Sequence, residues 1–351
     1  MQYSISIVIP VYNMGDTITK CVRSILENNN DIDIEVIIVD DGSNDNTPQI
    51  CDELAVKYKN VFVYHKTNEG SGPARNYGIK KASGKYIFFP DADDLLIDNA
   101  ISIMFHEMKN SDCDLLVFGF QSQTESGKVV SQKKYPYMTL DGETTRQHYS
   151  NYIGYEVKYP IQGAPWNKMF DLEIIKKYSI EFPSLRRHQD EAFIARYMCY
   201  VESIHFIEDI LYIHYTNDLK KEWDKYPVDY IKAVIGLRND RKHTILKWNK
   251  NDYETREWID CEYICGVIKA CELTFSPKAN LSFKKRRKRI YNYIKKSRIC
   301  DFINNSKTGK YQKAILFLAK NKMYLLAYIT MHIKISAEKK GIVQLIKTWM
   351  R

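Results

Sequence analysis

The first 120 residues alternate between short runs rich in β-branched residues and longer amphipathic stretches, and this alternation strongly constrains the fold. The short runs are apolar throughout rather than at every second position, as expected of strands covered on both faces of a parallel sheet. They predict strands at Ile5–Val11, Ile34–Val39, Val61–His65, Tyr86–Phe89 and Leu115–Phe120. The stretches between them predict helices near Thr17–Glu27, Pro48–Tyr58, Pro73–Ala82 and Leu95–Lys109. This order indicates an open, doubly wound α/β sheet that binds ligands at the carboxyl ends of its strands.

The 351-residue chain has two parts of opposite charge. Residues 221–351 contain 30 Lys and Arg against 12 Asp and Glu, a net of +18, whereas residues 1–220 contain 22 against 31, a net of −9. From about Pro227 onward the pattern is helical, after a polar, Tyr-rich stretch at 121–158 that we interpret as loops with an edge hairpin. We therefore predict two domains, an acidic α/β domain at 1–220 and a basic, mainly α-helical domain at 221–351.

Cysteine usage and the N-terminal residues both point to a reducing compartment. The eight cysteines include no CxxC pair, and we interpret them as reduced core residues. The chain begins directly with a strand-like run, without the basic region and cleavage site of a signal peptide. Its best apolar helical stretch, Met323–Ile333, is shorter than the roughly 20 residues that a bilayer crossing needs. These features predict a cytoplasmic protein without a spanning helix.

Acidic residues follow two of the predicted strands, as Asp40-Asp41-Gly42-Ser43 and Asp91-Ala92-Asp93-Asp94. In an extended backbone, Asp91 and Asp93 point to the same side and can bind one ligand together. Their hard carboxylate oxygens suit Mg²⁺ or Mn²⁺, which proteins commonly hold with one or two carboxylates and the phosphates of a substrate. The alternative is a solvated acidic turn at the start of the helix predicted from Leu95.

A glycine-rich turn precedes the third predicted helix, in the segment Asn68-Glu69-Gly70-Ser71-Gly72-Pro73-Ala74-Arg75-Asn76. Such turns let backbone N–H groups approach a phosphate. The spacing matches neither a P-loop nor a dinucleotide-binding fingerprint. Arg75 could supply a fixed cation to the site, or form an ordinary salt bridge on a helix face.

Four segments in chain order resemble the successive motifs of family 2 glycosyltransferases: Ile7–Asn13, Val39–Ser43, Ala74–Gly78 and Asp91–Asp94. The similarity covers about residues 4–215. It implies a GT-A fold, a nucleoside diphosphate sugar as donor with UDP as the default, a divalent metal ion, Mn²⁺ or Mg²⁺, and transfer with inversion at the anomeric carbon.

The resemblance also assigns roles to residues on the donor side. The nucleobase pocket would be walled by Pro10, Val11 and Tyr12, with Asn13 as a further substrate-binding residue. Asp41 would bind the nucleobase of the donor, and Asp91 with Ala92 would face its ribose. Asp93, together with Asp91, would hold the metal. Tyr12 could instead be a packed aromatic residue, and Asp41 a turn residue before Gly42.

Inversion in a single step requires a general base that takes the proton of the acceptor hydroxyl. Arg187–Phe193 resembles the family motif E-D-x-x-F, with Asp190 as the base and Gln189 in place of the usual first acid. Glu191 is a competing candidate, but it points about 100° away on a helix.

Two further segments resemble parts of the family's site. The segment Gly163–Phe170 resembles the W-N-K segment near the acceptor, which makes Trp166 a candidate acceptor-side residue. His214 ends a predicted strand and is either a third metal ligand or an ordinary half-buried histidine.

The basic domain carries nine Lys and Arg within 284–298, followed by the apolar stretches Ile315–Ala319 and Met323–Ile329. Basic residues beside apolar helical segments are typical of proteins that lie on an anionic membrane surface. A helical domain that only packs on the catalytic one is an alternative. No nucleic-acid-binding motif accompanies the patch, so we do not expect nucleic acid as a partner.

Together with these patterns, the family resemblance implies an inverting, metal-dependent glycosyltransferase that acts on a hydroxyl of a glycan or lipid-linked oligosaccharide. The resemblance places it in capsule or surface polysaccharide synthesis, peripheral on the cytoplasmic face of the cell membrane. The alternative is a non-catalytic relative that binds nucleotide or glycan as a scaffold. The presence of Asp41, Asp93 and Asp190 argues against it, because a binding module needs no base.

Overall fold

The computed structural model describes residues 3–27, 31–147, 161, 163–216, 226–227 and 229–339. The chain divides into two compact units. Unit 1 consists of Met1–Ser184 and Gln189–Leu219, and unit 2 of Leu185–His188 and Lys220–Arg351. Each unit is described by itself below.

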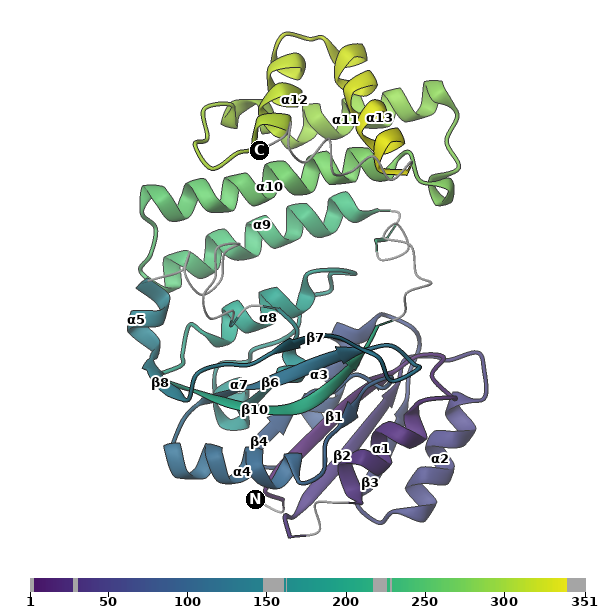
Figure 1. Ribbon diagram of the computed structural model, residues 1–351, viewed down its shortest axis with the longest axis vertical. Helices are drawn as coiled ribbons and strands as arrows, with labels where there is room; N and C mark the ends of the chain where they lie inside the picture. The colour runs from purple at the N-terminus through teal and green to yellow at the C-terminus, as the bar shows by residue number, and fades with distance from the viewer. Residues whose placement is uncertain are drawn as a thin grey trace. The chain divides into compact units, whose positions relative to one another are not determined.

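Unit 1 is built on a mixed sheet to which all ten strands of the described chain belong (Figure 1). The strands are β1 (Ile5–Val11), β2 (Ile34–Asp40), β3 (Val61–His65), β4 (Tyr86–Phe88), β5 (Leu95–Leu96), β6 (Leu115–Gln123), β7 (Val129–Lys133), β8 (Met138–Asp141), β9 (Lys168–Asp171) and β10 (Ser203–Tyr215). Their order is β3-β2-β1-β4-β9-β6-β10-β5, with β7 paired to β6 and β8 to β10. The neighbours from β3 to β4 are parallel, and β9 enters antiparallel between β4 and β6.

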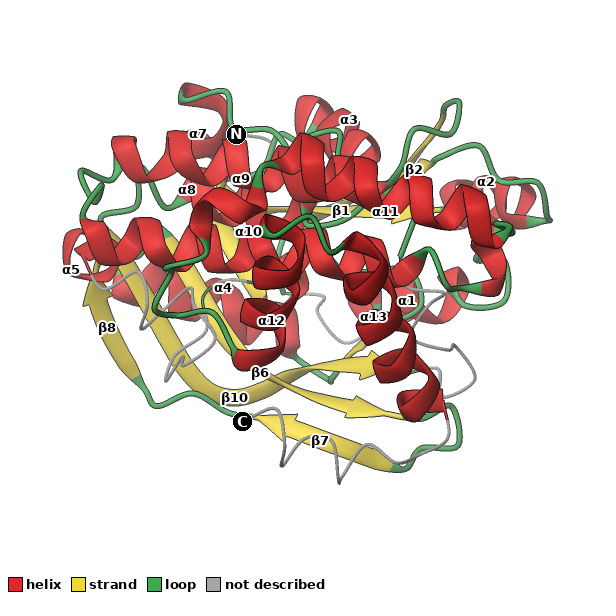
Figure 2. Cartoon of the chain, turned by 90° about the horizontal axis from the view of Figure 1, so that it is seen from above, coloured by secondary structure: helices red, strands yellow, loops and turns green. Residues whose placement is uncertain are grey.

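Helices pack on the two faces of this sheet because β1 and β2 are apolar on both faces (Figures 1 and 2). Ile5, Ile7 and Ile9 share one face with buried residues of α1 (Ile18–Leu26), α2 (Thr47–Lys57) and α4 (Ala100–Ser111). The opposite face of β1 carries Val8, which lies against Gly78 of α3 (Ser71–Lys81). A Cβ at Gly78 would lie 2.3 Å from a Val8 methyl carbon, so this glycine allows the helix to approach the sheet closely.

The other helices that the structure describes in unit 1 are α5 (Gly142–Gln147), α7 (Leu172–Lys177) and α8 (Gln189–Tyr197), together with a short 3₁₀ helix at Pro165–Asn167. Phe193 of α8 stacks on Phe182 at 3.8 Å and meets Phe89 edge-on at 5.7 Å. This aromatic cluster fixes the start of α8 close to the end of β4.

The predicted strands are confirmed to within a few residues, and so is an edge hairpin, formed by β6 and β7. Residues 148–158 of the polar stretch lie outside the described residues. The predicted helix start at Leu95 is wrong. Leu95 and Leu96 form β5, which pairs with Tyr212 and Ile213 of β10, and α4 begins only at Ala100. The acids at 91–94 therefore do not lie in the first turn of a helix.

Unit 2 is helical, as its sequence predicts. It contains α9 (Tyr230–Lys247), α10 (Tyr253–Leu273), α11 (Phe283–Ser297), α12 (Lys310–Lys320) and α13 (Tyr324–Lys339), with 3₁₀ helices at Pro277–Ala279 and Ile299–Phe302. Its core gathers Ile264, Val267, Ile294, Ile315 and Met331. Within the part of the chain that the structure describes, no helix is both long and apolar enough to span a bilayer.

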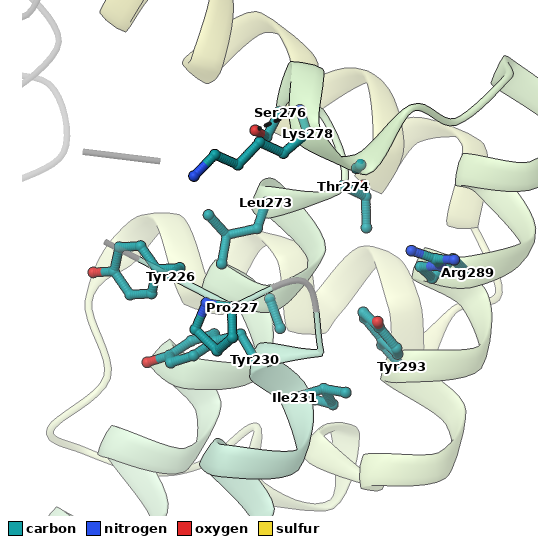
Figure 3. A pocket seen from close by; sticks show the side chains of 12 residues that line it. Tyr226, Pro227, Tyr230, Ile231, Leu273, Thr274, Ser276, Lys278, Arg289 and Tyr293 are labelled. Atoms are coloured by element: carbon teal, nitrogen blue, oxygen red, sulfur yellow. Dashed lines mark hydrogen bonds between the residues drawn. The ribbon is translucent and has the colours of Figure 1, made fainter. Parts of the chain in front are cut away.

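A small cavity in unit 2 lies beside Tyr230, Leu273 and Tyr293 (Figure 3). Its volume is about 30 Å³, which accommodates about one water molecule. The cavity is too small to bind a sugar or a nucleotide.

Candidate active site

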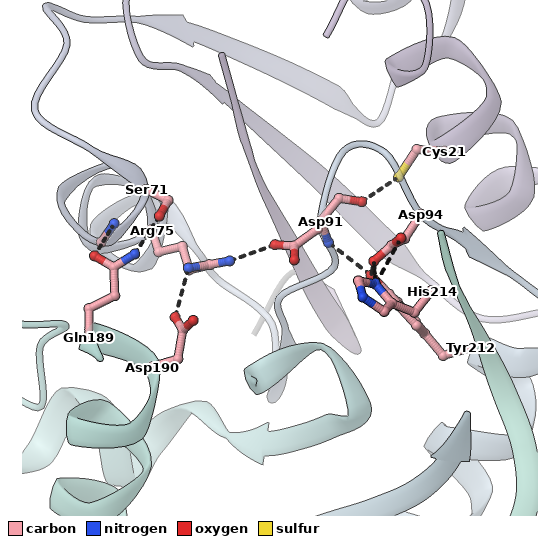
Figure 4. Close-up of polar contacts among 10 residues, drawn as sticks. Cys21, Ser71, Arg75, Asp91, Asp94, Gln189, Asp190, Tyr212 and His214 are labelled. Atoms are coloured by element: carbon pink, nitrogen blue, oxygen red, sulfur yellow. Dashed lines mark hydrogen bonds and ion pairs between the residues drawn. The ribbon is translucent and has the colours of Figure 1, made fainter. Parts of the chain in front are cut away.

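Arg75 joins three segments of unit 1 at the carboxyl ends of the strands (Figure 4). The side chain comes from α3 and is only 3% exposed. Its Nη2 donates to Asp91 Oδ1 at 2.7 Å, just after β4, and its Nη1 donates to Asp190 Oδ1 at 3.0 Å, in the first turn of α8. The third nitrogen, Nε, is buried and has no hydrogen-bond acceptor among the described residues. Arg75 thus brings a predicted donor-site carboxylate and the predicted base to one cation.

Acidic side chains outnumber cations around Asp91. Burial raises the pKa of Asp91 to about 7, and Arg75 opposes this shift. The nearby carboxylates of Asp94, Asp190 and Asp93 raise the pKa further. A site with this surplus of negative charge favours a ligand that brings positive charge.

The segment from Asp91 to Asp94 is a turn, not the extended backbone that the sequence suggested. The Asp94 N–H donates to the carbonyl oxygen of Asp91 at 3.2 Å, and Ala92 in this turn is buried. Asp94 is also buried and accepts from the Tyr212 hydroxyl at 2.7 Å and the Tyr215 N–H at 2.8 Å. The argument that Asp91 and Asp93 share one side of a strand is therefore wrong for this segment.

His214 and Trp166 lie in one aromatic stack beside this turn. The His214 Nδ1 is 3.2 Å from Asp94 Oδ2, and this hydrogen bond raises the pKa of His214 against the opposing effect of burial. The ring of Trp166, on the 3₁₀ helix Pro165–Asn167, stacks on His214 at 5.1 Å and on Tyr212 at 4.8 Å. Trp166, the acceptor-side candidate, is thus connected to the turn at Asp91–Asp94 through the rings of Tyr212 and His214, which both bind Asp94.

Tyr12 and Asn13 form an exposed loop after β1, whereas Pro10 and Val11 are buried within the strand. The Asn13 N–H donates to Ser43 Oγ at 2.9 Å, and Asn13 Oδ1 accepts from the Asn44 N–H at 2.8 Å. Tyr12 is 42% exposed, which leaves its ring accessible to a ligand.

Asp41 binds the loop before the glycine-rich turn. Its Oδ1 accepts from Lys66 Nζ at 2.9 Å and from the Glu69 N–H at 3.0 Å, and its Oδ2 accepts from the Gly70 N–H at 2.7 Å. The turn alternative for Asp41 applies to its neighbour instead, because Asp40 Oδ1 accepts from the Ser43 N–H at 3.0 Å.

Gln189 braces the glycine-rich turn against α8 (Figure 4). Its Oε1 accepts from the Gly72 N–H at 3.1 Å, and its Nε2 donates to the Ser71 hydroxyl. The residue that departs from the family pattern is thus a positioning contact, one residue before Asp190.

The structure brings Arg75, Asp91 and Asp190 into direct contact, and links Trp166 to His214. Sequence reasoning missed the roles of Asp94, Tyr212, Lys66 and Gln189. Of these, Gln189 carried a signal because it stands where the family has an acid, and Asp94 because it lies in the acidic segment Asp91–Asp94, but the inward direction of Asp94 could not be predicted.

The chemistry of the donor set fits a divalent cation, because hard carboxylate oxygens gather there with too few cations to balance them. No three His, Cys, Asp or Glu side chains among the described residues converge closely enough to hold a metal alone. Oxygens from a substrate would therefore have to complete the coordination.

Comparison with known proteins agrees with this geometry. Residues 6–163 match the family model of glycosyl transferase family 2. Over 221 residues the chain is 32% identical to glycosyltransferase GlyG of Streptococcus pneumoniae, a match that covers 61% of this chain and 71% of that protein. The chain belongs to glycosyl transferase family 2. It is also 26% identical over 309 residues to the uncharacterized glycosyltransferase EpsJ of Bacillus subtilis, covering 82% of this chain and 83% of EpsJ.

Solved structures show the same fold. TarS 1–349 of S. aureus, in complex with UDP-GlcNAc, matches with a TM-score of 0.63 and 19% identity, covering 96% of this chain and 92% of that chain. The mannosyltransferase PcManGT of Pyrobaculum calidifontis, in complex with GDP-Man and Mn²⁺, matches with a TM-score of 0.52 and 13% identity, covering 95% of this chain and 88% of that chain. The predicted family and GT-A fold are confirmed, and the protein is a glycosyltransferase.

The brace at Gln189 is tested by two substitutions. Gln189→Glu keeps an acceptor for the Gly72 N–H and can accept from the Ser71 hydroxyl, so kcat/KM for transfer should stay within about threefold of wild type. Gln189→Leu removes both bonds at similar volume and should lower kcat about tenfold, given about 0.5–1.5 kcal/mol for each bond. Thermal unfolding is recorded alongside, and equal loss of kcat in both variants would contradict this role.

Proposed function

We propose that the protein transfers a sugar from a nucleoside diphosphate, UDP by preference, to a hydroxyl of a glycan or lipid-linked acceptor, with inversion and with Mn²⁺ or Mg²⁺. The observation that carries the proposal is the contact of Arg75 with both Asp91 and Asp190. Both carboxylates bind the same guanidinium, which supports a donor-side role for Asp91 close to Asp190 as the base. The setting we propose is surface polysaccharide synthesis at the cytoplasmic face of the membrane.

The donor would bind along the carboxyl ends of β1, β2 and β4. Support comes from the exposed ring of Tyr12 beside Asn13, and from the loop that Asp41 holds next to the glycine-rich turn. TarS 1–349, which shares the fold, was solved with UDP and with UDP-GlcNAc. The buried Nε–H of Arg75, which has no acceptor in the described part of the chain, could donate to the diphosphate.

The metal would be held by the carboxylates of Asp93 and Asp91, with phosphate oxygens of the donor completing its shell. His214 could contribute only through Nε2, because Nδ1 is bonded to Asp94. A bound divalent ion would neutralise charge on the departing diphosphate. The Mn²⁺ in the structure of PcManGT supports this use of a metal in a protein of similar fold.

Asp190 would act as the general base. Its side chain is 32% exposed, so an acceptor hydroxyl can reach it, while Arg75 holds the carboxylate in one orientation. In a single displacement, the Asp190 carboxylate takes the hydroxyl proton as the oxygen attacks C1 and the bond from C1 to phosphate breaks. One displacement on the face opposite the leaving group inverts the anomeric centre.

The acceptor would enter beside Trp166. A cavity of about 440 Å³ lies there, and its lining includes aromatic residues, amide side chains and Lys168. Lys168 is buried, and its Nζ donates to Asn167 Oδ1 at 2.7 Å and to the Ala164 carbonyl at 3.0 Å. Burial lowers the pKa of Lys168 to about 7. An aromatic wall with amide groups at its edge suits a sugar ring, whose faces are apolar and whose rim is polar.

Asp190→Asn separates binding from chemistry. The amide keeps the shape of the side chain but cannot take a proton, so transfer should fall by about 10²–10⁴ while the affinity for UDP in the presence of Mn²⁺ is kept. Transfer is measured as product formed per unit time, and affinity by calorimetry. Glu191→Gln, one residue along α8, is the matched control and should retain activity. A dead Glu191→Gln with an active Asp190→Asn would assign the base to Glu191.

Metal dependence is tested by EDTA and by Asp93→Asn. Transfer should stop in excess EDTA and return on addition of Mn²⁺, and Asp93→Asn should raise the Mn²⁺ concentration for half-maximal rate at least about tenfold. Asp209→Asn, an exposed carboxylate on β10, is the control and should leave this concentration unchanged. Full activity of wild type in excess EDTA would contradict the metal role and would leave the turn at Asp91–Asp94 to bind the donor without a metal.

A further inference from the structure

The last helix of unit 2, α13, is apolar on two opposite sides. Its inner side packs into the core through Ala327, Tyr328, Met331 and Ile335. Its outer side exposes Leu326 at 44%, Ile329 at 41% and Ile333 at 62%, which recur at the spacing of one helix face. A helix at a water-exposed surface normally carries polar residues on that side. The outer side of α13 is therefore suited to an apolar surrounding.

Further apolar side chains extend this face toward α12. Phe317 of α12 is 58% exposed, Met323 in the turn between the helices is 40% exposed, and Leu325 is 46% exposed. We call the six side chains Phe317, Met323, Leu325, Leu326, Ile329 and Ile333 the α12–α13 patch. Lys320 and Lys322, both exposed, lie in the same turn region.

A row of cations on α11 borders α13. The two helices contact each other through two pairs of rings. The ring centroids lie 4.8 Å apart in Tyr291–Tyr324 and 5.3 Å apart in Phe283–Tyr328. Beside these rings, Lys284, Arg287 and Lys288 line a hollow of about 570 Å³. The three cations are exposed, and no ion pair joins them to a carboxylate among the described residues.

The charge of the whole region is strongly one-sided. Residues 281–339 contain 16 Lys and Arg against two acids, Asp301 and Glu338. Both acids are paired with neighbouring cations, Asp301 with Arg298 and Glu338 with Lys334. The region therefore combines exposed aliphatic side chains with a net charge of +14.

We propose that the α12–α13 patch and the α11 cations form a docking surface for an anionic lipid bilayer. The aliphatic side chains would enter the boundary between headgroups and acyl chains, with α13 lying along the surface, and Lys284, Arg287 and Lys288 would bind lipid phosphates. A second copy of the chain is disfavoured, because it would place two surfaces of +14 face to face. Nucleic acid would neutralise the cations but leave the aliphatic row exposed to water.

The test is flotation of the full-length protein with vesicles of phosphatidylcholine alone or with one quarter phosphatidylglycerol. Wild type should float with the anionic vesicles only, and 0.5 M NaCl should weaken the binding. The triple variant Leu326→Gln, Ile329→Gln and Ile333→Gln should weaken binding at least tenfold. Lys284→Gln, Arg287→Gln and Lys288→Gln together should weaken it about 100-fold.

Matched variants control for composition. Val56→Gln, Ile235→Gln and Leu246→Gln replace three exposed apolar residues elsewhere, and Lys20→Gln, Lys59→Gln and Lys242→Gln remove the same charge elsewhere. Both control triples should bind vesicles as wild type does. All changed side chains are exposed, so thermal unfolding should hardly move.

Three results would overturn the docking surface: flotation that the α13 triple does not change, a dimer in sedimentation equilibrium that this triple dissolves, or binding to oligonucleotides with no binding to vesicles. UDP release from a donor sugar is measured in parallel. Because vesicle binding is independent of the chemistry, a protein that floats as expected but releases no UDP would refute the proposed function alone.

Discussion

The guanidinium of Arg75 holds three segments of unit 1 together at the candidate site. It binds Asp91, 16 residues away, and Asp190, 115 residues away, so that α3, the end of β4 and the start of α8 meet at one buried cation. A buried cation without anions, or crowded carboxylates without a cation, carries a large desolvation or repulsion cost. The three segments therefore stabilise one another through this cation. Gln189 and the aromatic cluster at Phe193 add a second, uncharged link between α3, α8 and the sheet.

Much of the fold could be predicted from the sequence because β1 and β2 are buried on both faces. Their sequences are therefore apolar throughout, which is the pattern of strands inside a parallel sheet. The helix predicted from Leu95 failed for a tertiary reason. Leu95 and Leu96 pair as a strand with Tyr212 and Ile213, which lie more than 100 residues later in the chain. A strand of two residues is too short to show a periodic pattern in the sequence. The short strand β9, inserted antiparallel between β4 and β6, left no recognisable pattern either.

In the candidate site, too, some residues could be predicted from the sequence and others could not. The charged residues at the centre of the candidate site, Arg75, Asp91 and Asp190, stand in motifs and could be named in advance. Their partners could not, because side-chain direction depends on the folded backbone. Asp94 is adjacent to the motif acids yet turns inward to Tyr212, whereas Gln189 reaches Gly72 across 117 residues. The turn at Asp91–Asp94, which replaces an extended strand end, directs the Asp94 carboxylate inward toward Tyr212.

The central claim, that Arg75 and the base candidate Asp190 act as one charged unit, is tested most directly by a double-mutant cycle. The free energy of unfolding of unit 1 is measured in the full chain for wild type, Arg75→Met, Asp190→Asn and the double variant. If the two side chains act as one charged unit, the effects should be non-additive by at least about 1 kcal/mol, with Asp190→Asn costing less once Arg75 is gone. Effects that add to within about 0.5 kcal/mol would contradict the coupling.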